Sequence, residues 1–485
     1  MICISVTPES RKFAKVDMLN ASGQCDLIEL GLDRFLKVPD INELIGPIEK
    51  PVLVSCRRKE DGGHFIGSEE ERQALLRQAI IAEPDYVELE LDIARTVPRF
   101  GKTKRVVSYT SLDDPLGNVD DVFERAAQAN ADVVKFTWPT PTLEAAWPLL
   151  AAVSQKRDLP VVGLGLGRAG LTFSLLGRKY GAPWIYGALE KGMEAYKGQA
   201  TVHELDEIYG WRDLDSKTRL VGIVGFGPAE ETTIRVLNRG FQHEGLNARC
   251  LPLAIDNFDK MAKRLDALKI NALLTSRNLA SFILPLAEHV EEAVSVTQFA
   301  DLLLKQADGW HAYNSLWRSA VKTLEGRLGK SADDERPLDR HNVLVLGTGG
   351  LARTMIYGIR RRKGLISISA ADEKAGQELA RLTEARFITT SALYDTLADV
   401  VVLADPKIVL GHHRDELNPS YLRESMAAVD VAHFPESSDF IREASQRGCK
   451  TVDPTELFAN LVAAQFKSFT GKELEAEFVR DVLGE

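Results

Sequence analysis

One lysine of the sequence lies inside an apolar run. Lys135 stands in Val133–Phe136, among valine and phenylalanine residues. An ammonium group is costly to remove from water, so burial favours the neutral amine, which attacks ketones and forms imines. In the alternative interpretation, the side chain reaches the edge of its strand or forms an ion pair with Glu29 or Glu88. This residue therefore indicates either Schiff-base chemistry or a paired, structural lysine.

Other polar residues stand at the ends of neighbouring apolar runs. Glu29 ends one run, Arg57 follows the next, Glu88 lies in the one after, and Thr110 follows another. In a parallel barrel, the carboxyl ends of the strands form the face that carries the chemistry. We therefore expect these side chains to lie at one site with Lys135.

A glycine-rich turn in the second half has the pattern of a dinucleotide-binding motif. Residues 342–346 predict a strand, and the glycines after it allow a tight turn and close approach of a pyrophosphate to a helix N-terminus. Asp372, after the next strand, is placed to bind a ribose hydroxyl, or alternatively to cap a helix. The residues expected at the cofactor are Gly347, Gly349, Gly350, Leu351, Ala352 and Asp372. The cofactor expected is NADP or NAD.

Alternating apolar runs and helical segments must position these residues. Eight such units fill about the first 210 residues, which predicts an α/β fold with an N-terminal (β/α)8 TIM barrel. We expect three domains: the barrel over 1–212, a smaller α/β domain over 219–328, and a Rossmann domain with C-terminal helices over 338–485.

Composition excludes several classes of function. The 485 residues have 60 Lys and Arg against 70 Asp and Glu, a net charge of −10, which disfavours nucleic-acid binding. No apolar run reaches the roughly 18 residues of a membrane span, and no signal peptide is visible. The five widely spaced cysteines predict a reducing cytoplasm and no metal site.

The motifs of residues 1–212 resemble those of type I 3-dehydroquinate dehydratases. Four segments carry the resemblance: Asp26–Glu29, Arg57–Gly63, Val133–Lys135 and Gly198–Gln199. The resemblance implies that Lys135 forms an imine with the substrate ketone. It also implies that Glu29, Arg57 and Gln199 hold the substrate.

The chain departs from this family at several polar positions. Thr110 stands where the family has a proton-transferring histidine, and Gly31 replaces an arginine. The Ser-Arg pair that binds the substrate carboxylate falls near 172–173, and Asp61 replaces a glutamate. His64 is an alternative base, although a surface role suits it as well.

Residues 219–485 resemble shikimate dehydrogenase. The Gly-Thr-Gly-Gly turn, Val429–Pro435 and Phe469–Gly471 follow that family's spacing. The resemblance implies NAD(P)-linked reduction of 3-dehydroshikimate. The catalytic lysine of the family falls near Leu279 and its aspartate near 311–313, so both are absent, while Arg277 offers a nearby cation.

The interpretation is a shikimate-pathway enzyme, with the dehydratase half favoured. Its partners are small carboxylates such as 3-dehydroquinate, 3-dehydroshikimate or shikimate, and a homodimer is compatible with the sequence. The alternative is a divergent homologue that is non-catalytic, regulatory or altered in substrate, because several family catalytic residues are absent.

Overall fold

A computed structural model describes residues 1–113, 119–155, 157–167, 169–196, 198–255, 257, 261–277, 279–329, 337–413 and 416–484. The chain divides into two compact units. The first comprises Met1–Arg219 with Asn247–Asp256, and the second comprises Leu220–Leu246 with Asn257–Glu485. No helix in the described residues is both long and apolar enough to cross a membrane.

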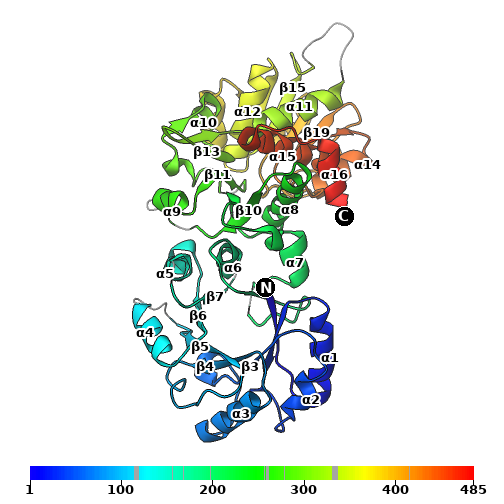
Figure 1. The fold of residues 1–485 in the computed structure, drawn as a ribbon. Coiled ribbons are helices and arrows are strands. Elements are labelled where there is room, and N and C mark those ends of the chain that lie inside the picture. Colours follow the sequence, from blue (N-terminus) through cyan, green and yellow to red (C-terminus); the bar gives the residue numbers. More distant parts are fainter. Residues whose placement is uncertain are drawn as a thin grey trace. The chain divides into compact units, whose positions relative to one another are not determined.

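The first unit is a barrel of eight parallel strands (Figure 1). The strands are β1 (Ile2–Val6), β2 (Leu27–Gly31), β3 (Val52–Ser55), β4 (Tyr86–Glu90), β5 (Lys104–Thr110), β6 (Val133–Pro139), β7 (Val161–Leu166) and β8 (Ile185–Gly187). Their hydrogen-bonded order is β7-β6-β5-β4-β3-β2-β1-β8. The predicted α/β barrel is therefore confirmed, and the order of the runs in the sequence is the order of the strands in space.

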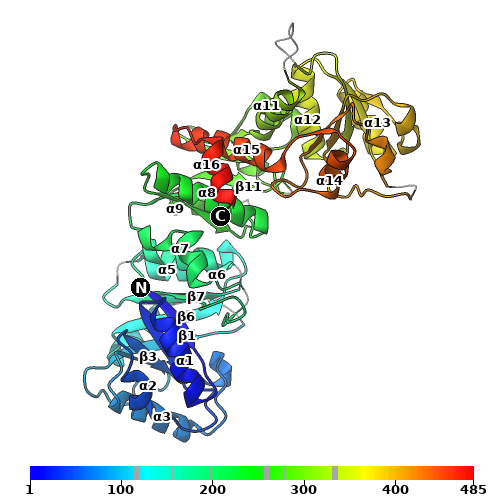
Figure 2. The ribbon, with the colours of Figure 1, turned by 90° about the vertical axis from the view of Figure 1, so that its right-hand side faces the viewer.

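Helices cover the outside of these strands (Figure 2). They are α1 (Arg11–Ser22), α2 (Ile41–Ile45), α3 (Glu69–Ile81), α4 (Asp120–Gln128), α5 (Leu143–Ser154), α6 (Gly170–Lys179) and α7 (Val202–Glu207). A strand that is covered on both faces has a continuous apolar sequence. A charged residue inside one of them is therefore buried in the barrel, which positions the site below.

The second unit contains a mixed sheet whose strands lie in the order β9-β11-β13-β14-β12. These strands are β9 (Arg219–Val224), β11 (Ile270–Thr275), β12 (His289–Val290), β13 (Leu302–Gln306) and β14 (Gly309–Tyr313). Its helices are α8 (Pro228–His243), α9 (Met261–Ala267), α10 (Glu292–Thr297) and α11 (Leu316–Leu328). β10 (Ala248–Leu253) falls within the first unit.

A second, wholly parallel sheet completes this unit. The strands are β15 (Asn342–Leu346), β16 (Leu365–Ser369), β17 (Arg386–Phe387), β18 (Val400–Leu403), β19 (Ala427–Asp430) and β20 (Lys450–Thr451). The helices are α12 (Gly350–Arg361), α13 (Glu373–Leu382), α14 (Asp439–Gln446), α15 (Pro454–Thr470) and α16 (Ala476–Gly484). The strand order is β17-β16-β15-β18-β19-β20, so the chain adds strands on one side of β15 and then on its other side. Ligands of doubly wound sheets bind at the point where the strand order switches in this way.

Candidate active sites

The barrel holds Lys135 in a buried ion pair. The residue lies on β6, opposite Ser108 of β5, and its side chain is 1% exposed. Its Nζ donates to Oε2 of Glu88 at 2.9 Å and lies 4.7 Å from the ring centre of Tyr186. The structure therefore shows an ion pair with Glu88, and this pair fixes the position of the Nζ atom that Schiff-base chemistry would use.

Arg57 joins the two carboxylates of this cluster. Its guanidinium donates to Glu88 Oε2 at 2.7 Å and Oε1 at 3.1 Å, and also to Glu29 Oε1. Glu29 accepts two further hydrogen bonds, from Ser55 Oγ at 2.7 Å and Ser5 Oγ at 3.0 Å. Two cations and two anions thus balance one another inside the barrel, which is how buried charges become tolerable.

The charges of the cluster keep both carboxylates ionised. Burial alone would raise the pKa of Glu88, but Arg57 and Lys135 outweigh it and hold that pKa well below its usual range. The same balance lowers the pKa of Glu29. Burial raises the pKa of the Tyr186 hydroxyl, and the neighbouring Glu29 raises it further. The cluster is therefore charged, and its phenol is neutral.

A cavity of about 360 Å³ opens beside this cluster. Glu29, Arg57 and Gln199 line it together with Tyr186. The first three are the residues that, by resemblance, are expected to hold the substrate. Lys135 is not among the lining residues. Its Nζ contacts the ring of Tyr186, which is part of the cavity wall.

Two lining residues that the sequence reasoning missed hold His64 at this cavity. The His64 backbone N–H donates to Asp33 Oδ2 at 2.8 Å, and the ring Nε2 lies 2.8 Å from Arg34 Nη2. The His64 side chain is 54% exposed and also lines the cavity. Asp33 and Arg34 lie two and three residues after β2, at the carboxyl end of a barrel strand, so the rule that located Arg57 would also have located them.

The positions that depart from the family offer little acid-base chemistry. Thr110 is a partly exposed hydroxyl at the end of β5. Thr172 Oγ1 donates to the carbonyl of Pro252, and Phe173 is buried. Gly63 cannot carry a side chain, because a Cβ atom there would lie 2.2 Å from the Arg57 carbonyl oxygen. His64 is the histidine that lines this cavity.

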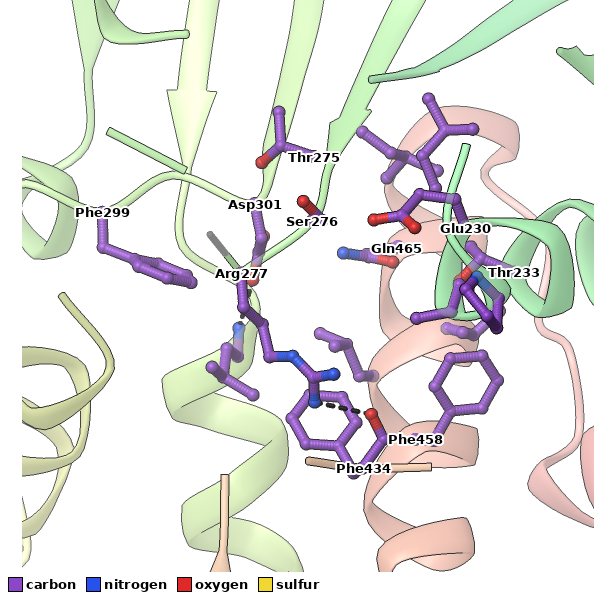
Figure 3. Close-up of a pocket in the computed structure, with 18 residues that line it drawn as sticks. Glu230, Thr233, Thr275, Ser276, Arg277, Phe299, Asp301, Phe434, Phe458 and Gln465 are labelled. Carbon is purple, nitrogen blue, oxygen red and sulfur yellow. Dashed lines mark hydrogen bonds between the residues drawn. The ribbon is translucent and has the colours of Figure 1, made fainter. Parts of the chain in front are cut away.

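A second cavity, of about 300 Å³, lies in the second unit (Figure 3). Arg277, just after β11, stacks on Phe434 with its guanidinium carbon 4.2 Å from the ring centre. Its Nη1 donates to the Phe434 carbonyl at 2.5 Å. Burial lowers the pKa of Arg277, although the charges of Asp430 and Glu230 oppose the shift. The guanidinium forms no ion pair at salt-bridge distance with a described residue, so it can bind an anionic ligand.

Two further polar side chains of this cavity are buried. Glu230, in the first turn of α8, is 8% exposed, and Gln465 of α15 is 5% exposed. Within the described residues, neither side chain has a hydrogen-bond partner, and both line the cavity. Their polar atoms are open to the cavity rather than enclosed by protein, so the pair can donate to and accept from a ligand there. The sequence reasoning singled out neither residue.

Asp301 also lines this cavity but is engaged by the backbone. Its two carboxylate oxygens accept from the N–H groups of Ser315 at 2.9 Å and Leu316 at 2.7 Å. Burial raises the pKa of Asp301 to about 6 despite these bonds. His311 and Tyr313, near the family's aspartate position, do not line the cavity. Burial therefore raises the pKa of a carboxyl group that lines this cavity.

The glycine turn after β15 has the backbone that the sequence predicted. Gly347 has φ +122°, and a Cβ atom there would lie 2.8 Å from Cβ of Asp405. Gly349 caps α12, whose first turn contains no acidic residue, and no atom lies within 4 Å of its would-be Cβ. Leu351 and Ala352 are buried in the core. An anion can therefore approach the N-terminus of α12, which fits the pyrophosphate of a dinucleotide.

A cavity of about 590 Å³ adjoins the end of β16. Ser369, Ala370, Ala371 and Glu373 line it. Asp372 does not line this cavity; its carboxylate caps α13 and accepts from the N–H of Ala375 at 3.0 Å. The helix-capping alternative for Asp372 is therefore observed, and the acidic residues that line the cavity are Glu373 and Glu416.

Comparison with known proteins agrees with the motifs of both halves. Residues 2–216 match the family model "Type I 3-dehydroquinase". Over 469 residues the chain is 25% identical to the bifunctional 3-dehydroquinate dehydratase/shikimate dehydrogenase of Arabidopsis thaliana, covering 92% of this chain and 78% of that protein. Over 256 residues it is 23% identical to shikimate dehydrogenase (NADP(+)) of Syntrophobacter fumaroxidans, covering 52% of this chain and 87% of that protein. The crystal structure of shikimate dehydrogenase from Aquifex aeolicus aligns with a TM-score of 0.49 and 19% identity, covering 56% of this chain and all of that one.

Proposed function

We propose that this chain, in which a type I 3-dehydroquinase domain precedes a shikimate dehydrogenase-like region, is a bifunctional enzyme of the shikimate pathway. The barrel dehydrates 3-dehydroquinate, and the second half reduces the resulting 3-dehydroshikimate with NADPH or NADH. The observation that carries the proposal is the buried Lys135 on β6 beside a cavity lined by Glu29, Arg57 and Gln199.

In the barrel, the Lys135 ammonium first gives a proton to Glu88 across their 2.9 Å hydrogen bond. The neutral amine then attacks the substrate ketone, and the carbonyl oxygen leaves as water. The imine acidifies the neighbouring carbon, a base takes its proton, and the β-hydroxyl leaves as water. Hydrolysis of the imine then frees the product and Lys135. Arg57, Glu29 and Gln199 bind the substrate, Glu88 positions the Nζ atom, and a shift of the Tyr186 ring opens the path from the cavity to Nζ.

The proton must move through a group other than Thr110, because a threonine hydroxyl is not a base near neutral pH. We assign this role to His64. It lies on the same cavity wall, and Asp33 holds its backbone N–H. Its Nε2 can take a proton once the hydrogen bond from Arg34 opens.

In the second half, we propose that residues 219–328 and 338–485 act as the substrate and cofactor lobes. The backbone at Gly347, Gly349 and Gly350 would hold the pyrophosphate, and Leu351 and Ala352 anchor the helix behind it. When bound, the reduced cofactor, NADPH or NADH, would supply the hydride for reduction of a ketone. Arg277 binds the substrate carboxylate, and Glu230 and Gln465 accept and donate to its hydroxyl groups.

Trapping of the imine tests the central step. The full chain is incubated with 3-dehydroquinate and sodium borohydride, and its peptides are weighed by mass spectrometry. We expect an adduct on Lys135, no adduct in Lys135→Ala, and an unchanged adduct in Lys104→Ala, which removes an exposed lysine of β5. Absence of the adduct from the unmodified chain would refute the proposed dehydratase mechanism.

Turnover distinguishes this proposal from a non-catalytic homologue. A non-catalytic homologue would show neither dehydration nor NAD(P)-linked oxidation of shikimate, even at high protein concentration.

The five cysteines, all buried and without disulfide bonds, agree with the cytoplasmic location that we propose. Sedimentation will show whether the chain forms a homodimer.

A further inference from the structure

Two histidines and an aspartate converge on one face of the mixed sheet, and no part of the proposed activity uses them. His289 of β12 pairs in register with His311 of β14. The two rings stack with their centres 4.4 Å apart. Asp308, in the turn before β14, lies between their Nε2 atoms: Oδ1 is 2.8 Å from His311 and Oδ2 is 3.2 Å from His289.

The geometry points to a site for a transition-metal dication of the zinc class, with His289 Nε2, His311 Nε2 and an Asp308 carboxylate oxygen as its ligands. One donor atom from each residue lies within 4.8 Å of the other two. Zinc takes imidazole nitrogen and carboxylate oxygen at about 2.0–2.1 Å, which places neighbouring donors of a tetrahedral ion about 3.3 Å apart. The observed separations, 2.8 Å from Oδ1 to His311 and 3.2 Å from Oδ2 to His289, show that both imidazoles reach the same carboxylate. A rotation of that carboxylate brings one oxygen toward both nitrogens.

The backbone fixes all three ligands in place. The two histidines are held by strand pairing, and Asp308 is held by a tight turn that Gly309 closes with φ +131°. Glu288 packs over this turn: its carboxylate accepts from the N–H of Trp310, and a Cβ atom at Gly309 would lie 2.8 Å from it. The ligands therefore need little ordering when a metal binds.

The donor set decides which ion fits. Two imidazoles and one carboxylate favour Zn²⁺, Ni²⁺ or Cu²⁺ over Mg²⁺ and Ca²⁺, which prefer oxygen alone. All three side chains are accessible, with 48%, 61% and 21% exposure for His289, Asp308 and His311. An ion can therefore enter from solvent and keep water at its remaining positions. It would tie the edge strand β12 to β14.

Titration of the chelator-treated full chain with ZnCl₂, against a chromophoric competitor, tests the site. The cysteines are all buried, so thiols compete little. We expect one zinc ion per chain. His289→Ala and His311→Ala should each weaken binding by at least about tenfold, since even a residue that only supports a ligand is commonly worth that much. The control is His243→Ala, which removes an exposed histidine 3.2 Å from the Glu244 carboxylate and should leave zinc affinity unchanged.

Two further measurements keep the test decisive if one variant folds poorly. Zinc should raise the melting temperature of the unmodified chain and of His243→Ala, because binding stabilises the folded state, but not that of Asp308→Asn. Cobalt substitution should give the visible spectrum of a nitrogen- and oxygen-ligated ion that disappears in His311→Ala. Zinc affinity equal in all variants, or several equivalent weak ions per chain, would overturn the proposal.

Discussion

The Nζ atom of Lys135 and the Oε2 atom of Glu88 lie 2.9 Å apart, with both side chains almost fully buried. The same oxygen accepts from Arg57 Nη2 at 2.7 Å. One carboxylate therefore holds both the proposed nucleophile and the cation that we propose binds the substrate. This arrangement gives the cluster its stability and sets where the amine points.

We expect Glu88→Gln to destabilise the barrel strongly. Without this charge, Lys135 and Arg57 share Glu29 as their one remaining carboxylate in the cluster, and breaking a buried ion pair costs about 3–5 kcal/mol. Urea unfolding of the full chain measures the change. Glu60→Gln removes a 71% exposed carboxylate 3.1 Å from Arg58 and should cost at most about 1 kcal/mol. Equal effects of the two substitutions would contradict the inferred role of burial.

We expect His64→Ala to slow dehydration by about 10²–10⁴-fold, the usual contribution of a positioned proton-transfer group. The borohydride-trapped adduct on Lys135 should persist, because His64 acts after the imine has formed. Added imidazole should restore part of the rate. A variant with unchanged turnover would show that the proton moves elsewhere.

Thr110→His offers a second route for that proton in the His64→Ala background. Register pairs Thr110 with Thr137 and Ser108 with Lys135. Alternation along β5 then places residue 110 on the same face as Ser108, one layer nearer the strand ends. A histidine there should recover dehydration, whereas Ser111→His, on the opposite face, should not.

Stability of the second unit should fall as the pH rises through the titration of Asp301. Burial raises the pKa of this carboxyl to about 6 from an ordinary value of 3.8, so the folded state binds the proton more tightly than the unfolded state does. Its contribution is complete below about pH 4 and is lost through pH 6, a change of about 3 kcal/mol. Melting temperatures of the full chain between pH 4 and 8 measure it.

Asp301→Asn should flatten that pH dependence, because the amide oxygen can still accept a backbone N–H but does not titrate. Asp266→Asn removes a 51% exposed carboxylate, 3.5 Å from Lys305, and should leave the profile as it is. An unaltered profile in Asp301→Asn would assign the titration to another group.

Gly347→Ala should abolish NADP and NAD binding. Its φ of +122° strains any residue with a Cβ atom, and that atom would collide with Asp405. Fluorescence titration with NADPH and NADH measures affinity.

Asp372→Asn separates the two roles considered for Asp372, capping of α13 and binding of a ribose hydroxyl. The amide still caps α13, so a loss of NADH affinity without loss of stability would indicate contact with the ribose.

The sequence predicted those features that depend on local pattern. Apolar runs located the barrel strands because strands covered on both faces are apolar throughout, and Lys135 stood out as a charge within such a run. Glu230 escaped notice because acidic residues are common in the first turn of any helix. Gln465 escaped because the face of α15 that meets the cavity is decided by packing. The pairing of Lys135 with Glu88 rather than Glu29 likewise depends on side-chain positions that spacing does not specify.

Arg277→Gln should weaken binding of shikimate and 3-dehydroshikimate by at least about tenfold, since a charge-assisted hydrogen bond is worth about 1.5–3 kcal/mol. Isothermal titration measures the affinity. Arg318→Gln is the matched control, because Arg318 also stacks on an aromatic ring, that of Trp317 at 4.8 Å, but is 57% exposed. Glu230→Gln should raise KM while the variant still binds NADPH normally, because the buried carboxylate meets the substrate and not the dinucleotide. Unchanged affinity in both Arg277→Gln and Glu230→Gln would place the substrate outside this cavity.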